Sequence, residues 1–351
     1  MQLLQHFGSV LYLYKYFAKR KKNMWQEVIS SKVHKKENIF KIIKNILKVS
    51  IPMSLCSLFS ATTKTIDALT VVRILKGIIG EESATVQYGI LNGKVDTLVM
   101  LPFSFNIAFA TALVPTISSA IAKKEIDIAK RRIKFSILVT ILIGIPCSIL
   151  MSAFSNEFLS LLFPNASLGS QMLKVSAWTI VFVVLTQTIN GALQGMGKVN
   201  VSVIAFGVGS IIKLILNVTL IPIFKVNGAA YASVLSSITT FMICYIELKK
   251  SINIKFNINK FLIKPIIASC IMYAFSYFIN TNLKLINSQN IRFIIALLFG
   301  LIIYIISIII LKILSQEEIF MLPYGQLIYK KMNNKQTSKN RTTKGIHKIQ
   351  S

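Results

Sequence analysis

Long apolar runs separated by short polar gaps dominate the chain from residue 49 onward. Each run is long enough for the ~20 helical residues that cross the hydrocarbon core of a bilayer, and none leaves a continuous polar face for water. The pattern therefore predicts an all-α fold, a polytopic bundle of transmembrane helices. The eight predicted spans cover residues 49–72, 88–113, 133–154, 172–193, 201–221, 228–248, 262–279 and 291–313.

The two ends of the chain have a different character. Residues 1–18 are apolar and are followed by four basic residues, the reverse of the order in a signal peptide, so they are predicted to be a partial transmembrane helix. Residues 19–48 are predicted to form a basic cytoplasmic linker. Residues 314–351 are predicted to form a basic cytoplasmic tail.

Basic residues gather in alternate gaps between the spans. One set of gaps holds 30 Lys and Arg residues and the other set holds 6. Because cytoplasmic loops carry the excess of Lys and Arg, this asymmetry predicts a multi-pass protein of the bacterial cytoplasmic membrane with a cytoplasmic C-terminus. The net charge of +28 would suggest nucleic acid in a soluble protein. Here the charges lie where topology signals belong, so no nucleic-acid partner is expected.

Residues suited to catalysis or metal binding are sparse. The four cysteines lie in separate apolar segments, without the short spacing of a metal or redox site, and the three histidines are scattered. The glycine-rich stretch 191–198 lacks the spacing and the Ser or Thr of a phosphate-binding loop. We therefore expect no enzyme activity, no cofactor and no metal.

Ionisable residues inside the first two predicted spans are candidate cavity residues, since burying a charge in lipid is costly. Lys64 and Asp67 lie three residues apart and share a helix face, so they could line a cavity or form a local ion pair. Lys94 and Asp96 lie two apart and cannot face each other. Lys94 could line a cavity or extend to the membrane interface.

A second group of candidates lies further along the chain. Lys213 sits near the middle of its span, with Asn217 one turn later on the same face. It could present a cation to a cavity, or it could pair with one of the two span acids on another helix. Gln187 and Asn190 belong to a polar stripe that could contact substrate or join helices. With all three span lysines in one cavity, an anionic amphiphile such as a lipid pyrophosphate would be favoured over an organic cation.

Several separate stretches carry a family resemblance. Residues 187–198 read QTINGALQGMGK, and they are followed by Lys213 to Asn217 in GSIIKLILN and by NGAA at 227–230. These stretches, with SIP at 50–52, LP at 101–102, LVP at 113–115 and the ending at 314–325, resemble stage V sporulation protein B and related polysaccharide flippases. That family belongs to the multidrug/oligosaccharidyl-lipid/polysaccharide exporter superfamily.

The resemblance implies a fold, a substrate and a missing partner. Members have fourteen helices in two six-helix lobes plus two more, and they are thought to move undecaprenyl-pyrophosphate-linked glycans by alternating access. By this resemblance, residues 49–248 would be the second six-helix lobe and residues 249–313 the two additional helices. The first lobe has no counterpart here, so we expect a truncated or split gene product. Its partners would be membrane lipids, the lipid-linked glycan, and a separately encoded N-terminal lobe or a second copy.

Three functions remain open on these grounds. The first is a flippase for a lipid-linked oligosaccharide or peptidoglycan precursor, in cell-wall or spore-cortex synthesis. The second is a multidrug cation antiporter of the same superfamily, which the excess of Lys over Asp in the spans disfavours. The third is a non-transporting membrane scaffold in envelope or spore assembly.

Overall fold

The computed structural model describes residues 14–18, 20, 38–163, 168–282, 288–315 and 317–318. Contacts divide the chain into two compact units, Met1–Lys48 and Val49–Ser351. Of the helix predicted over residues 1–18, only residues 14–18 are described, and they are helical. The predicted linker and tail lie largely outside the described residues.

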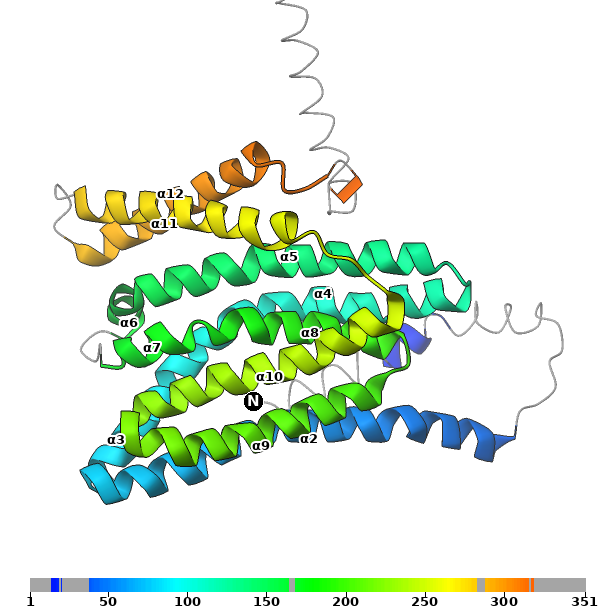
Figure 1. Ribbon diagram of the computed structural model, residues 1–351, viewed down its shortest axis with the longest axis horizontal. Helices are drawn as coiled ribbons and strands as arrows, with labels where there is room; N and C mark the ends of the chain where they lie inside the picture. Colours follow the sequence, from blue (N-terminus) through cyan, green and yellow to red (C-terminus); the bar gives the residue numbers. More distant parts are fainter. Residues whose placement is uncertain are drawn as a thin grey trace, which may run out of the picture. The chain divides into compact units, whose positions relative to one another are not determined.

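Every regular element in the described part of the chain is a helix (Figure 1). Eight helical segments there are long and apolar enough to cross a membrane, which confirms the predicted number of spans. The elements are α2 (Ile39–Ile79), α3 (Glu81–Ile90), η1 (Leu91–Val95), α4 (Asp96–Ala122), α5 (Ile126–Ala153), α6 (Ser155–Leu162), α7 (Ser170–Ser176), α8 (Thr179–Gly195), α9 (Val199–Phe224), α10 (Val226–Ile252), η2 (Asn259–Ile263), α11 (Lys264–Asn282) and α12 (Gln289–Ile310).

Helix α2 begins at Ile39, ten residues before the predicted span. The physical reason is an amphipathic pattern, because Ile39, Ile42, Ile43 and Ile46 recur at helical spacing among lysines. Such a pattern favours helix without being apolar enough to register as a membrane span. The end of the predicted linker is therefore helical.

In the second unit, α8 is the central helix. It packs against α4, α5, α9 and α10, and α10 lies alongside α9. Helices α11 and α12 form a pair, and α11 rests on α5 (Figure 1). The two additional helices thus cover one side of the bundle, away from the contact between α2 and α9.

Two apolar clusters form the core of this unit, and polar side chains lie between them. One cluster includes Leu113 of α4 and Leu248 of α10, and the other includes Leu98 of α4 and Val226 of α10. Helix α9 contributes to both clusters near its ends, with Lys213 buried between its contributions. Polar groups therefore occupy the middle depth of the bundle, where satisfying them inside the protein matters most.

Large apolar side chains cover the outside of the helices. Five from α9 are more than half exposed, namely Ile204, Ile211, Ile215, Val218 and Ile223. A comparable surface on a soluble protein would mark an interaction site. In a multi-pass membrane protein such a surface suits contact with lipid chains or with another helical element, because both are as apolar as these side chains.

Candidate functional site

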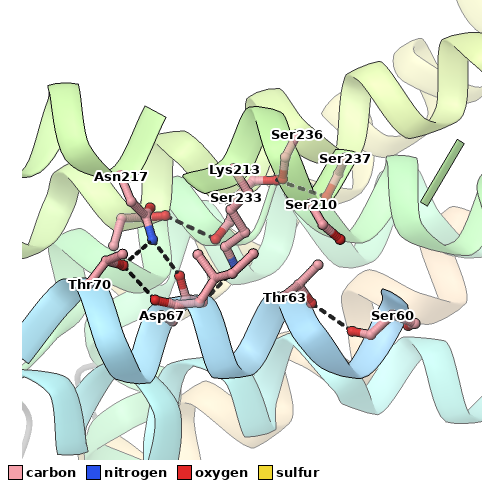
Figure 2. A network of polar contacts seen from close by, with 12 residues as sticks. Ser60, Thr63, Asp67, Thr70, Ser210, Lys213, Asn217, Ser233, Ser236 and Ser237 are labelled. Atoms are coloured by element: carbon pink, nitrogen blue, oxygen red, sulfur yellow. Dashed lines mark hydrogen bonds and ion pairs between the residues drawn. The ribbon is translucent and has the colours of Figure 1, made fainter. Parts of the chain in front are cut away.

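A buried ionic cluster joins α2 to α9 (Figure 2). The Lys213 ammonium donates to Asp67 Oδ2 at 2.5 Å, and the Asn217 amide donates to Asp67 Oδ1 at 2.9 Å. The same amide donates to Thr70 Oγ1 at 2.8 Å. The side chains of Lys213 and Asp67 are only 8% and 9% exposed. Asp67 and Thr70, about one turn apart on α2, therefore face Lys213 and Asn217, about one turn apart on α9.

The sequence left two interpretations of Lys213, a cation facing a cavity or a partner in an ion pair, and this arrangement distinguishes them. Its ammonium is not an unpaired cation facing a cavity but half of a buried ion pair with Asp67. The physical reason is the cost of burying a lone charge, which a carboxylate with a second hydrogen-bond donor offsets. The alternative pair of Lys64 with Asp67 does not form, since Lys64 is exposed and has no ion pair within the described residues.

Asp96, the first residue of α4, belongs to the surroundings of this cluster. It lies close enough to Lys213, Asp67 and Lys64 for electrostatic interaction with each, and it is partly buried. The two acids and two of the three span lysines are thereby brought into one region between α2, α4 and α9.

Lys94 lies elsewhere, so the predicted three-lysine cavity is not formed. Its ammonium sits 5.5 Å from the centre of the Phe163 ring, in cation–π geometry. Lys94 lies in the π-helical turn η1, only two residues before Asp96. Residues two apart on a helix point in different directions, which separates Lys94 from the cluster around Asp67.

The polar stripe of α8 contacts neighbouring helices. Asn106 of α4 donates to the side chains of Gln187 and Thr188, at 3.1 and 3.0 Å, and its own carbonyl accepts from Thr140 of α5. One turn away, Asn190 accepts a hydrogen bond from Ser202 of α9. Gln187 and Asn190 therefore join helices in this structure.

Asn106, Thr140 and Thr70 were not among the residues selected from the sequence. Asn106 is fully buried and links three helices. An isolated amide in a long apolar run was a signal for it. The two threonines resemble the many that bond only to their own helix backbone, such as Thr62 and Thr116, so nothing in the sequence distinguished them.

The cluster around Asp67 is made of ionic and hydrogen-bonding groups. Within the described residues, no group of His, Cys, Asp and Glu could hold a metal ion. The eight apolar helices and the charges buried between them define a multi-pass helical membrane protein.

The family model described as "Lipid II flippase MurJ" matches residues 23–291. Since this is well over half of the chain, the protein belongs to the MurJ family of lipid-linked precursor flippases.

Two relatives come from Bacillus subtilis (strain 168). The uncharacterized membrane protein YabM is 31% identical over 195 residues, which cover 56% of this chain and 36% of YabM. The lipid II flippase MurJ is 25% identical over 252 residues, which cover 71% of this chain and 46% of the relative. The matched part thus spans between about a third and a half of these relatives' length.

Solved structures support the same fold. A lipid II flippase MurJ in an inward closed conformation aligns with a TM-score of 0.58 and 19% identity, covering 84% of this chain and 57% of that one. An outward-facing multidrug transporter of the MATE family aligns at 0.50 with 16% identity, covering 80% and 74%. At such low identity these likenesses concern the fold alone.

Proposed function

We propose that this chain forms the second lobe of a flippase that moves a lipid-linked oligosaccharide or peptidoglycan precursor across the cell membrane. The observation that carries the proposal is the family match over residues 23–291. The site supports an anionic lipid substrate, because Lys64 remains an exposed cation one turn from the neutralised pair of Asp67 and Lys213. A pyrophosphate is a strong acceptor for such a group.

A single lobe would need a complementary one. Transporters built from two repeats bind substrate at the interface between them, and this chain matches less than half of MurJ from Bacillus subtilis. The complementary lobe could belong to the same polypeptide, to a separate chain or to a second copy. Each of these arrangements would place α2 and α9 beside the substrate path.

The multidrug antiporter is the weaker alternative. An organic cation requires accessible acids, and the carboxylate of Asp67 already binds Lys213 and Asn217. Only Asp96 among the span acids has no ion pair or hydrogen bond within the described residues. One such acid beside two lysines makes a poor site for a cation.

Complementation in a bacterium depleted of its own lipid II flippases would test the proposal. The full chain is expressed alone and together with the first lobe of the Bacillus subtilis MurJ relative. Membrane insertion is checked in each strain. The readout is exposure of lipid-linked precursor to a headgroup-cleaving enzyme added outside. We expect precursor to become exposed when both lobes are present.

Single substitutions test whether Lys64 contacts the substrate. Lys64→Gln is expected to slow exposure of the precursor about tenfold, because it removes one charge-assisted hydrogen bond to the substrate. Lys249→Gln, at the end of α10, is the control and should leave the rate of exposure unchanged. An inserted two-lobe protein that exposes no precursor but lowers cellular drug accumulation would support the antiporter instead. Restored envelope shape without exposed precursor would support a scaffold.

A further inference from the structure

Two adjoining hollows open at the end of the bundle where α3, α7 and α10 begin, near the labels α3 and α7 in Figure 1. Their volumes are about 660 and 620 Å³, each within the range of small-molecule sites. Gln171 of α7 and Asn227 of α10 line both hollows. Neither hollow includes any residue of the cluster around Asp67.

Three carboxamide side chains from three helices converge on the first hollow. Gln87 of α3 joins Gln171 and Asn227 there. The amide of Asn227 donates to Gln171 Oε1 at a long 3.4 Å. Gln87 Oε1 and Asn227 Oδ1 are buried without a hydrogen-bond partner in the described part of the chain. Unpaired acceptors of this kind are rare in folded proteins. A rotation of either side chain toward the hollow would let its oxygen accept a hydrogen bond from a bound molecule.

The charges around the hollows point to a neutral ligand. Among the described residues that line them, Glu82 and Lys174 are the only charged ones, one of each sign. A carboxamide offers both an acceptor oxygen and donor N–H groups. Groups that donate and accept at once, such as hydroxyl and acetamido groups, complement three convergent carboxamides better than an anion or a cation does.

Aromatic surfaces complete the second hollow. Trp178 and Tyr231 line it beside Gln171 and Asn227, and they are 46% and 42% exposed. Aromatic residues also collect at membrane interfaces for general reasons. These two, however, flank the carboxamides in one hollow. A pyranose ring has hydroxyls along its edge and an apolar C–H face, which is the combination that amides beside aromatic rings accommodate.

We infer that the two hollows form a glycan-binding site for one or two neutral sugar rings, held by Gln87, Gln171 and Asn227 and stacked on Trp178 or Tyr231. Such a site would hold a sugar headgroup at one end of the lobe, apart from the charged cluster that would meet a pyrophosphate. The existence of the site stands on the hollows alone, whereas the choice of an acetamido sugar as probe rests on the proposed function.

The chain offers an internal reporter for this site, because Trp25 and Trp178 are its only tryptophans. In a Trp25→Phe background, emission therefore reports on Trp178. The purified full chain in detergent is titrated with N,N′-diacetylchitobiose, with mannitol as a polyol that has no ring to stack. We expect a saturable change of Trp178 emission with the disaccharide and none with mannitol.

Substitution of the carboxamides tests the contacts directly. Asn227→Ala and Gln171→Ala should each weaken the apparent affinity at least tenfold. Asn282→Ala, an exposed amide at the end of α11, is the matched control and should leave the affinity unchanged. Should either variant fail to fold, saturation-transfer NMR on the unsubstituted chain serves instead, with the strongest transfer expected at the ring C–H protons of the sugar.

Other outcomes would overturn the inference. These are an absent or unsaturable emission change, an equal response to mannitol, or unchanged affinity in both folded carboxamide variants. The proposed function fails separately, because a chain that binds the disaccharide without exposing lipid-linked precursor retains the glycan site. Conversely, precursor exposure without sugar binding removes only the site.

Discussion

Asp67 and Lys213 carry opposite charges into the middle depth of the helix bundle. Their side chains are almost fully buried, and the Asn217 amide donates both to the carboxylate and to Thr70 Oγ1. The attraction within such a pair is offset by the cost of taking both ions out of water. The pair therefore contributes little net stability compared with an apolar contact, but each partner depends strongly on the other.

Removing one charge should cost much more than removing both. Asp67→Asn leaves the Lys213 ammonium buried without a carboxylate, and breaking a buried pair in this way typically costs about 3–5 kcal/mol. The double variant with Lys213→Met should lose less than the single variant. Thermal unfolding in detergent measures the difference. Lys64→Met serves as the control and should change stability by less than ~0.5 kcal/mol, because Lys64 is exposed and unpaired within the described residues. Additive losses in the double variant would show that the two residues are not coupled.

The sequence limited the possible ion-pair partners of Lys213 to two acids but did not show which of them it contacts. The four-residue spacing placed Lys213 and Asn217 on one face, and pairing with a span acid was one of two open interpretations. Asp67 and Asp96 were equivalent candidates on that reasoning. The choice between them depends on how α2 and α4 are rotated toward α9, which tertiary packing determines and no local pattern encodes.

At the scale of helices, α4 and α8 approach each other unusually closely. A Cβ atom added at Gly191 would lie 2.5 Å from the carbonyl oxygen of Ala110. One added at Gly195 would lie 2.9 Å from Ile117 Cβ. The two glycines are four residues apart, the spacing that lets membrane helices pack backbone to backbone. The start of the glycine-rich stretch 191–198 is thus a helix-packing surface of α8.

Gly191→Ala should separate α4 from α8. The added methyl group meets a backbone carbonyl that cannot rotate aside, so we expect a loss of about 1–3 kcal/mol, the usual cost of overpacking. Gly89→Ala is the matched control, because that helical glycine has nothing within 4 Å of an added Cβ, and alanine should stabilise its helix by up to ~1 kcal/mol. Unfolding midpoints at one scan rate measure both. Equal midpoints for the two variants would contradict the close approach.

The sequence predicted the helices themselves better than the hydrogen bonds between polar side chains of different helices. Eight runs of membrane-spanning length sufficed for the number and order of the spans. The start of α2 at Ile39 was missed, because a lysine-rich amphipathic helix is not apolar enough to stand out. The hub at Asn106 was missed as well, since its partners Thr140 and Thr188 acquire their role only when three helices pack together.

At the scale of the whole molecule, charge is distributed unevenly along the spans. The turn between α4 and α5 is flanked by basic residues at 123, 124, 130, 131, 132 and 134, whereas the turn between α9 and α10 has only Lys225. The direction of each helix puts these two turns at opposite ends of the bundle. Since basic loops stay in the cytoplasm, we propose that the turn between α4 and α5 is cytoplasmic. The glycan hollows, at the end where α10 begins, would then face outward.

Two turn positions make this orientation measurable. Lys124 and Lys225 are both exposed, so a cysteine at either position would be open to a reagent on its own side of the membrane. In a background without the four native cysteines, intact cells are treated with a membrane-impermeant maleimide. We expect Lys225→Cys to be labelled and Lys124→Cys to be protected until the cells are permeabilised, because only the former turn would lie outside. Labelling of both variants in detergent establishes that neither thiol is intrinsically unreactive. The opposite pattern in intact cells would invert the bundle and would place the glycan hollows in the cytoplasm, where they could receive a headgroup but not release it outside.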